Sequence, residues 1–483
     1  MTPNPTLEHP SPPPNSAKWW AMLGVGLGVL MFTLDTSIVN IALPSLVQIF
    51  HTTFATIQWV VLSYLLVITA LVLGAAHLGD MVGKKRLYLG GLVVFTISSL
   101  LCGLAPGVGW LIAFRALQGM GAVMISALGA AIVTEVFPSA ERGRALGIIG
   151  AVVSLGVALG PTVGGLLIGL SGWRSIFLVN VPIGIFATLV VIRYVPNSVY
   201  RAGRQPFDWW GSVLMTLTLI SFALGMTHGQ DQGFGHPLTL GLLAIATLGL
   251  ALFLWLESRL RFPVLDLQLF KNLQFSLSLL TGVLVFVVIA GTILIIPFFL
   301  ELVLHYSTQR VGLLLAVAPV LGGIIAPFSG NLSDRFGTRI ISLIGLVLMV
   351  VGCLSISTFN AGMGDLDYIL RVVPFGVGLG IFQSPNNSAI LGSVPPERLG
   401  IASGLLSLTR TLGQTTGVPL LGAIFAALTL AHSTATNVTS VTSAPPEAMV
   451  AGFQGIFRLA ALVLAIASVI VFTLWRSQPR KST

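Results

Sequence analysis

The sequence predicts an all-α polytopic membrane protein with fourteen transmembrane helices, arranged as two six-helix bundles with two extra helices between them. Of its 483 residues, 55% are hydrophobic and only 8% are charged, whereas about a quarter of the residues of soluble domains are charged. A spanning helix needs about 20 mostly apolar residues, and runs of that length recur along the whole chain. This composition excludes a cytosolic enzyme, a disordered chain and a disulfide-built secreted domain.

The apolar runs give the order of the elements. Six runs predict the first bundle, at about 20–43, 55–77, 87–105, 110–134, 145–170 and 175–194. Two extra spans follow at about 209–228 and 238–257. The second bundle is expected at about 274–298, 308–329, 339–359, 367–392, 401–429 and 453–475. The runs are too long for membrane strands and do not alternate as strands do, so each should be a helix.

Charge predicts the topology and the domain boundaries. An even number of spans places both tails on one side, and most of the 24 Lys and Arg lie in the tails and loops of that side. Cytoplasmic loops carry this excess, so we expect both termini in the cytoplasm. The expected location is the plasma membrane, which is the inner membrane in a bacterial cell. The net charge of +9 then needs no nucleic-acid partner. The predicted parts are a tail (1–18), a bundle (19–194), a linker with the extra helices (195–273), a bundle (274–475) and a tail (476–483).

Internal repetition relates the two bundles to each other. Similar landmarks recur 254 to 257 residues apart, namely Asp80 and Asp334, Arg115 and Arg371, Glu141 and Glu397, and Gly156 and Gly413. Two related halves are typical of transporters whose binding site lies where the repeats meet.

Asp35 and Arg115 are the leading candidates for function, because charges inside hydrocarbon are costly. Arg371, Arg410 and Arg458 also lie within apolar runs. At 1.5 Å per residue, Asp35 lies roughly 12 Å and Arg115 roughly 8 Å from the outer surface, so the two can share one polar pocket. Burial favours a neutral carboxyl and a nearby arginine favours a charged one, which suits a group that exchanges protons. The alternative is a static ion pair that fixes helix packing.

Two short loops resemble each other and are candidates for gating. The loop after the second span contains Asp80, Gly83, Lys84 and Lys85, and the corresponding second-half loop contains Asp334, Arg335, Gly337 and Arg339. An acid, a glycine and basic residues can turn tightly and contact a neighbouring loop or lipid headgroups. The alternative is a topology signal with no other role.

The fifth span is rich in small residues. Gly156, Gly160 and Gly164 share one helix face, which allows close approach of a partner helix. Pro161 favours a kink, and Gly165 completes the pattern. The alternative interpretation is tight packing alone.

The substrate cavity is expected among polar and aromatic residues of the spans. The candidates are Phe32, Trp59, Tyr64, Gln118, Gln383 and Asn386. The chain has no P-loop, no dinucleotide fingerprint and no His, Cys or carboxylate cluster typical of a metal site. We therefore expect no metal, no cofactor and no enzymatic activity.

Four segments resemble the major facilitator superfamily, and within it the fourteen-span drug:proton antiporters. They are Leu34-Asp35-Thr36-x-x-Val39-Asn40-x-Ala42-Leu43-Pro44, Arg115 to Ala122, Gly156 to Gly165, and Gly172-Trp173-Arg174-x-x-Phe177-x-x-Asn180-x-Pro182-x-Gly184. The resemblance covers about residues 18–476. The first gating loop departs from the family pattern, with Ala76 and Met81 where Gly and Arg are usual.

The resemblance implies a major facilitator fold and a multidrug efflux permease that works by alternating access, with the proton gradient as its energy source. Asp35 and Arg115 would handle the proton, Asp80, Gly83 and Lys84 would gate the cytoplasmic side, and the fifth-span pattern would favour exchange over leak. The implied partners are the lipid bilayer, protons and small amphipathic substrates. The sequence does not indicate whether a periplasmic adaptor and an outer-membrane channel are also partners.

Three alternatives remain beside the drug exporter. The same fold can export a specific metabolite, amino acid, siderophore or self-made antibiotic, and the sequence does not separate these cargoes. A nutrient symporter is disfavoured by the fifth-span pattern. A membrane-embedded enzyme or channel-like sensor needs a catalytic cluster or a continuous pore, and the sequence contains neither signal.

Overall fold

The computed structural model describes residues 15–138, 141–197, 209–260, 269–394, 399–433 and 441–476. Within these ranges the chain is helical and contains no strand, which confirms the predicted fold class. Helices follow the apolar runs because a helix satisfies all its backbone hydrogen bonds internally, as hydrocarbon requires. Most of the predicted tails lie outside the described residues. The first helix begins at Asn15 and includes Lys18, which we expected in the tail; its ammonium binds the Glu141 carboxylate 2.7 Å away.

The first half comprises the chain up to Tyr194. Its elements are α1 (Asn15–Ile38), η1 (Val39–Ala42), α2 (Leu43–Ile49), α3 (Phe54–Val82), α4 (Lys84–Gly103), α5 (Val108–Val136), α6 (Arg142–Ser171), α7 (Ser175–Leu178) and α8 (Asn180–Tyr194). The extra helices are α9 (Trp209–Gln232) and α10 (Pro237–Glu257).

The second half has the same plan of six long helices. Its elements are η2 (Leu269–Lys271), α11 (Leu273–Phe298), the π-helical η3 (Phe299–Val303), α12 (Thr308–Leu315), α13 (Val317–Phe336), α14 (Thr338–Ile356), α15 (Asp365–Leu391), α16 (Leu399–Ala431), η5 (Val441–Ser443) and α17 (Pro446–Arg476). Thirteen described segments are long and apolar enough to cross a membrane. The fourteenth long helix, α15, is more polar, with Asp365, Asp367 and Arg371 near its start.

The two halves repeat the same packing contacts, as the sequence repetition predicts. A Cβ placed on Gly121 of α5 would lie 2.7 Å from the carbonyl oxygen of Gly91 in α4. A Cβ on Gly378 of α15 would lie 2.7 Å from the carbonyl oxygen of Gly345 in α14. In each half, glycines at matching positions therefore let two helices approach backbone to backbone. The two helices are α4 and α5 in the first half, and α14 and α15 in the second.

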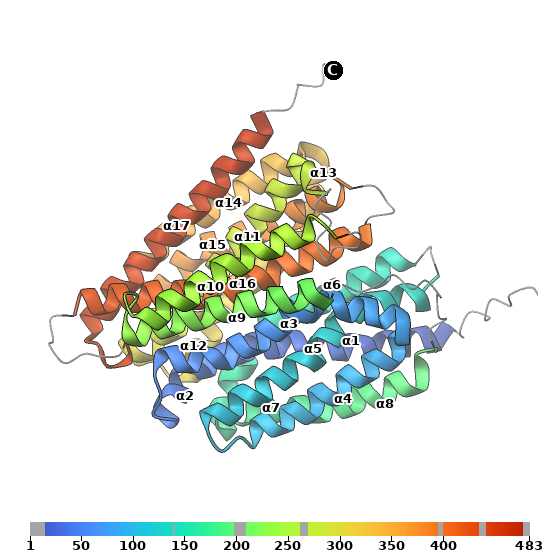
Figure 1. Cartoon of the computed structure of the whole chain (residues 1–483), viewed down its shortest axis with the longest axis horizontal. Helices are drawn as coiled ribbons and strands as arrows, with labels where there is room; N and C mark the ends of the chain where they lie inside the picture. Colours follow the sequence, from blue (N-terminus) through green and yellow to red (C-terminus); the bar gives the residue numbers. More distant parts are fainter. Residues whose placement is uncertain are drawn as a thin grey trace, which may run out of the picture.

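The halves meet at one end of the molecule and diverge towards the other. Figure 1 shows them converging beside α2 and α12 and separating towards the end where α17 terminates. We call the first the closed end and the second the terminal end, because Asn15 and Arg476 lie there. At the closed end, Ser45 donates a hydrogen bond to Glu301 over 3.3 Å, and the Phe54 and Phe298 rings meet edge to face.

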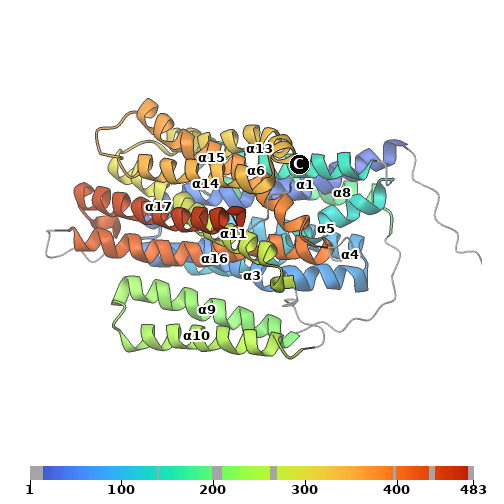
Figure 2. The ribbon, with the colours of Figure 1, turned by 90° about the horizontal axis from the view of Figure 1, so that it is seen from above.

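The extra helices lie outside both bundles, with α9 against the molecule and α10 beyond it (Figure 2). The Gln58 side chain of α3 donates to Gln230 of α9 over 3.0 Å, and Gln230 donates to the carbonyl oxygen of Pro419 in α16 over 3.5 Å. Trp59 donates to Thr227 over 3.2 Å. The helix α9 therefore bridges the two halves.

The glycine contacts predict a sharp difference between two neighbours on α4. A Cβ on Gly91 would lie 2.7 Å from the Cβ of Met124, whereas a Cβ on Gly90 would have nothing within 4 Å. Overpacking costs about 1–3 kcal/mol, so Gly91→Ala should lower the thermal unfolding midpoint in detergent and Gly90→Ala should not. Equal midpoints for the two variants would contradict the close packing of α4 against α5.

Candidate functional site

Asp35 lies at the centre of a polar cluster inside the first half. Its Oδ2 accepts a hydrogen bond from Arg115 of α5 at 2.5 Å, and its Oδ1 accepts from Gln118 at 2.9 Å and from Asn180 of α8 at 3.1 Å. The Asp35 side chain is 0% exposed and that of Arg115 is 1% exposed. The structure thus brings the two predicted residues together as a buried ion pair.

Arg115 has further partners that hold it in place. Its Nε donates to the carbonyl oxygen of Val60 over 3.0 Å, and its Nη1 donates to Gln118 over 2.6 Å. The guanidinium lies over the Tyr64 ring, 4.1 Å from the ring centre. Gln118 in turn donates to Ser99 of α4 over 2.7 Å. Removing one partner of such a pair leaves a buried charge uncompensated. The neighbours that hold Arg115 in place therefore help to fix the geometry of the Asp35–Arg115 pair.

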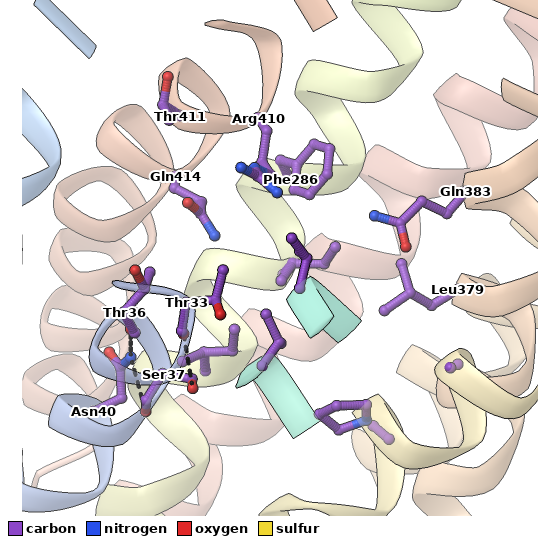
Figure 3. A pocket seen from close by; sticks show the side chains of 18 of the residues that line it. Thr33, Thr36, Ser37, Asn40, Phe286, Leu379, Gln383, Arg410, Thr411 and Gln414 are labelled. Carbon is purple, nitrogen blue, oxygen red and sulfur yellow. Dashed lines mark hydrogen bonds between the residues drawn. The ribbon is translucent and has the colours of Figure 1, made fainter. Parts of the chain in front are cut away.

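The helix α1 connects this cluster to the centre of the molecule. Successive helix residues are rotated by about 100°, so Thr33, Thr36 and Ser37 occupy other sides of α1 than Asp35, and Asn40 follows in η1. These four residues line a cavity between the halves (Figure 3). The hydroxyls of Thr36 and Tyr64 lie 3.4 Å apart, which links the cavity wall to the residue stacked on Arg115.

The cavity has a volume of about 530 Å³ and is lined by both halves. Binding pockets for small molecules typically measure about 300–1,000 Å³ and are mostly apolar with a few polar groups. Its walls come from α1, α3, α5, α6, α11, α12, α13, α15 and α16. The apolar lining includes Phe32, Ile68, Phe286, Ile289 and Leu379. The arrangement suits an amphipathic molecule.

The predicted cavity residues fall into two groups. Phe32 and Gln383 line the cavity. The prediction of cavity lining is wrong for the other four, which contact neighbouring helices instead. Trp59 donates a hydrogen bond to α9, and Asn386 is buried beside α11. Tyr64 and Gln118 belong to the Asp35 cluster. Span position alone does not say which side of a helix faces inward.

Sequence reasoning missed three polar residues. Asn180 and Ser99 complete the Asp35 cluster, and Asn180 had a signal, since it occupies a fixed position of the segment 172–184. Arg410 of α16 lines the cavity. Its signal was its place in an apolar run, but nothing in the sequence distinguished it from Arg371, which donates to the carbonyl oxygen of Thr358 over 2.8 Å.

The fifth-span glycines pack on two partners. A Cβ on Gly156 would lie 2.0 Å from the Thr33 hydroxyl, one on Gly160 would lie 1.8 Å from the Ser37 hydroxyl, and one on Gly164 would lie 2.7 Å from Ile38. These three glycines therefore hold α6 against α1.

The last part of the same segment contacts the second half. A Cβ on Gly165 would lie 2.6 Å from the carbonyl oxygen of Thr308, and one on Gly312 would lie 2.4 Å from that of Pro161. The segment thus touches both α1 and α12, at the closed end of the cavity.

The two gating-loop candidates form matching turns. Gly83 and Gly337 have φ angles of 102° and 91°, which residues with side chains rarely adopt. Lys84 forms an ion pair with Glu135. Lys85 donates to the carbonyl oxygen of Ile192 near the end of α8 over 3.0 Å.

The second-half turn repeats this bond. Arg339 donates to the carbonyl oxygen of Leu474 near the end of α17 over 2.8 Å and also to Gln274. Arg335 is exposed. The side chains of Asp80 and Asp334 lie outside the described part of the chain. Among the residues that are described, no three His, Cys, Asp or Glu are grouped to hold a metal ion.

Two repeated helical bundles around a central cavity that is closed at one end are the architecture of a secondary transporter. A sequence profile of the Major Facilitator Superfamily matches residues 25–418, with a second match over 278–483. The chain belongs to this superfamily. It is therefore a multi-pass membrane transporter and not an enzyme.

Individual relatives refine this assignment. Multidrug resistance protein Stp of Mycobacterium tuberculosis is 35% identical over 86% of this chain and 77% of its own length. Riboflavin transporter RibZ of Clostridioides difficile is 36% identical over 85% of this chain and 88% of its own length. The similarity to Stp places the chain with the drug efflux proteins of the superfamily, and both relatives are bacterial.

The fold has a solved counterpart. The crystal structure of a bacterial homologue of the human lysosomal transporter Spinster, in an inward-facing and unoccupied conformation, superposes with a TM-score of 0.72. The match covers 96% of this chain and 98% of the other, at 15% identity. At this identity the comparison supports the fold alone.

The ion pair predicts strongly non-additive effects on stability. Asp35→Ala or Arg115→Ala alone leaves a buried charge without its partner, which costs about 3–5 kcal/mol. The double variant Asp35→Ala/Arg115→Ala removes both charges and should lose less stability than the sum of the single variants. Thermal unfolding of the four proteins in detergent measures the coupling, and additive losses would contradict a direct pair.

Proposed function

We propose that the protein is a proton-coupled exporter of amphipathic, drug-like compounds that works by alternating access. The observation that carries this proposal is the buried Asp35–Arg115 pair, because Asp35 belongs to α1, which also lines the cavity. A carboxylate in hydrocarbon is costly, and carboxylates at such positions mark proton relays or substrate pathways. Here it lies next to the substrate path without opening into it, as a separate proton site requires.

The proton acts on the packing of α1. When Asp35 is ionised, its two oxygens accept bonds from Arg115, Gln118 and Asn180. Protonation removes the charge that attracts Arg115, which keeps its bonds to Val60 and Gln118. The interaction between α1 and α5 therefore weakens. The protonation state of the Asp35 carboxyl thus changes the free energy of moving α1 within its bundle.

The glycine segment of α6 transmits this change. Gly156 and Gly160 hold α6 against Thr33 and Ser37 of α1, while Gly165 contacts Thr308 of the second half. A shift of α1 therefore reaches the contact that closes one end of the cavity. A close-packed contact of this kind switches between discrete arrangements rather than deforming gradually, which favours exchange over leak.

The orientation of the protein in the membrane follows from the charge distribution. Positively charged loops mark the cytoplasmic side, so the terminal end faces the cytoplasm and the cavity described here is accessible from inside. Asp80, Gly83, Lys84 and Lys85, with their second-half counterparts, gate that side. One proton entering across 100 mV supplies about 2.3 kcal/mol. Asp35 is protonated from outside as substrate leaves and releases the proton inward as new substrate enters.

Export of one specific metabolite is the second candidate. It is favoured by the similarity to a protein named as a riboflavin transporter. The two candidates share the proton site and differ in the range of compounds that the cavity accepts. A broad panel of chemically unrelated compounds separates them, because a specific exporter moves one and a drug exporter moves several.

Proton coupling is tested in proteoliposomes that enclose a pH-sensitive dye. The wild-type protein should move protons when a transported compound is added, and Asp35→Asn should abolish this movement. The same variant should still exchange labelled for unlabelled compound, because the cavity is unchanged.

Asp365→Asn is the matched control, since Asp365 also pairs with an arginine, Arg310 at 2.9 Å, but is 44% exposed. This control should keep proton movement. Full proton coupling in Asp35→Asn, or equal loss in both variants, would refute the assignment of the proton to Asp35.

A further inference from the structure

The cavity between the halves carries a single charge. Arg410 is the one Lys, Arg, Asp, Glu or His among its lining residues. Asp35, the acid on the neighbouring face of α1, is already bound to Arg115. Within the described part of the chain, Arg410 makes no hydrogen bond or ion pair with another side chain, and its guanidinium points towards the middle of the cavity (Figure 3).

Two amides, those of Gln414 and Gln383, line the same cavity. Gln414 is one helical turn after Arg410 on α16, so both occupy the same face. Gln383 projects from α15 towards the same space (Figure 3). By contrast, several hydroxyl groups of the wall bond their own helices: Thr33 donates to Val29, Thr292 to Val288 and Thr411 to Leu408.

An uncompensated arginine in apolar surroundings is costly. An anion that enters the cavity removes this cost, because a guanidinium binds a carboxylate, sulfonate or phosphate through charge-assisted hydrogen bonds. A cation gains no partner there and is repelled by Arg410, since the described lining residues include no acid. The electrostatics therefore discriminate by the sign of the ligand charge.

We propose that the cavity is a binding site for amphipathic anions, whose acidic group binds Arg410, with Gln414 and Gln383 lining the same cavity. The apolar body of the ligand lies against Phe286, Ile289 and Leu379, which line the same cavity. This inference deepens the proposed function and rests on it in one respect, namely that this cavity holds the transported compound. It narrows the cargo from drug-like compounds in general to acidic ones.

The site also has a connection to the proton cluster. Tyr64 stacks on Arg115, and its hydroxyl lies 3.4 Å from that of Thr36, which lines the same cavity as Arg410. An anion bound at Arg410 reduces the positive potential on this side of the cluster. Tyr64 thus lies between the cavity wall and the proton cluster.

Binding of two dyes with one ring system tests the proposal. Fluorescein is an anion at neutral pH, and rhodamine 6G is a cation built on the same xanthene. Fluorescence anisotropy with purified protein in nanodiscs measures both affinities without any proton gradient. Wild-type protein should bind fluorescein at least about tenfold more tightly than rhodamine 6G. The free energy of a hydrogen bond to a charged group corresponds to about a tenfold or larger change in affinity.

Three variants identify the charge responsible. Arg410→Gln should weaken fluorescein binding about 10- to 100-fold and leave or improve rhodamine 6G binding, whereas Arg410→Lys should keep much of the preference. Arg458→Gln removes the same charge from the exposed side of α17, outside the cavity, and should change neither affinity. Thermal unfolding confirms that each variant is folded.

The outcomes are decisive for the site independently of transport. Equal or tighter binding of rhodamine 6G by wild-type protein, no binding of fluorescein, or unchanged fluorescein binding in Arg410→Gln overturns the anion site. Failure of proton coupling in the Asp35 experiment leaves this binding result unaffected. A dye preference without proton movement would therefore overturn the exporter mechanism and keep the anion site.

Discussion

The carboxylate of Asp35 and the guanidinium of Arg115 meet inside the first bundle, where neither is accessible to solvent. In hydrocarbon each charge is tolerable only beside the other. This requirement fixes α1 against α5, brings Gln118, Asn180 and Ser99 into one network, and orients the remaining sides of α1. The cavity face and the glycine contacts of the molecule follow from that orientation.

The two halves are joined unequally along their length. At the closed end they share contacts through Gly165, Gly312 and the Phe54–Phe298 ring pair. Along the side of the molecule, α9 bonds to Gln58 of one half and Pro419 of the other through Gln230. The extra helices therefore contact both halves. Alternating access requires these halves to move relative to each other. The bond from Gln230 to Pro419 is long, at 3.5 Å, which is compatible with small movements of one half against the other.

Much of this architecture could be predicted from the sequence. Apolar runs gave the helices, and a constant offset between landmarks gave the two halves, because hydrocarbon leaves few alternatives to the helix. Depth along the spans was sufficient to pair Asp35 with Arg115. The direction in which a side chain points was harder to predict. Trp59 and Gln118 turn away from the cavity and Arg410 turns into it, since rotation of each helix depends on packing against neighbours that are distant in sequence.

The central claim is that Asp35 changes its protonation state during transport rather than serving as a fixed ion pair. The infrared absorption of protonated carboxyl groups measures this directly in purified, lipid-embedded protein titrated over the pH range in which transport occurs. The account predicts a band that titrates in that range, shifts when a transported compound is added, and is missing from Asp35→Asn. A spectrum in which wild-type protein and Asp35→Asn titrate identically would mean that Asp35 stays ionised throughout, and would contradict the account.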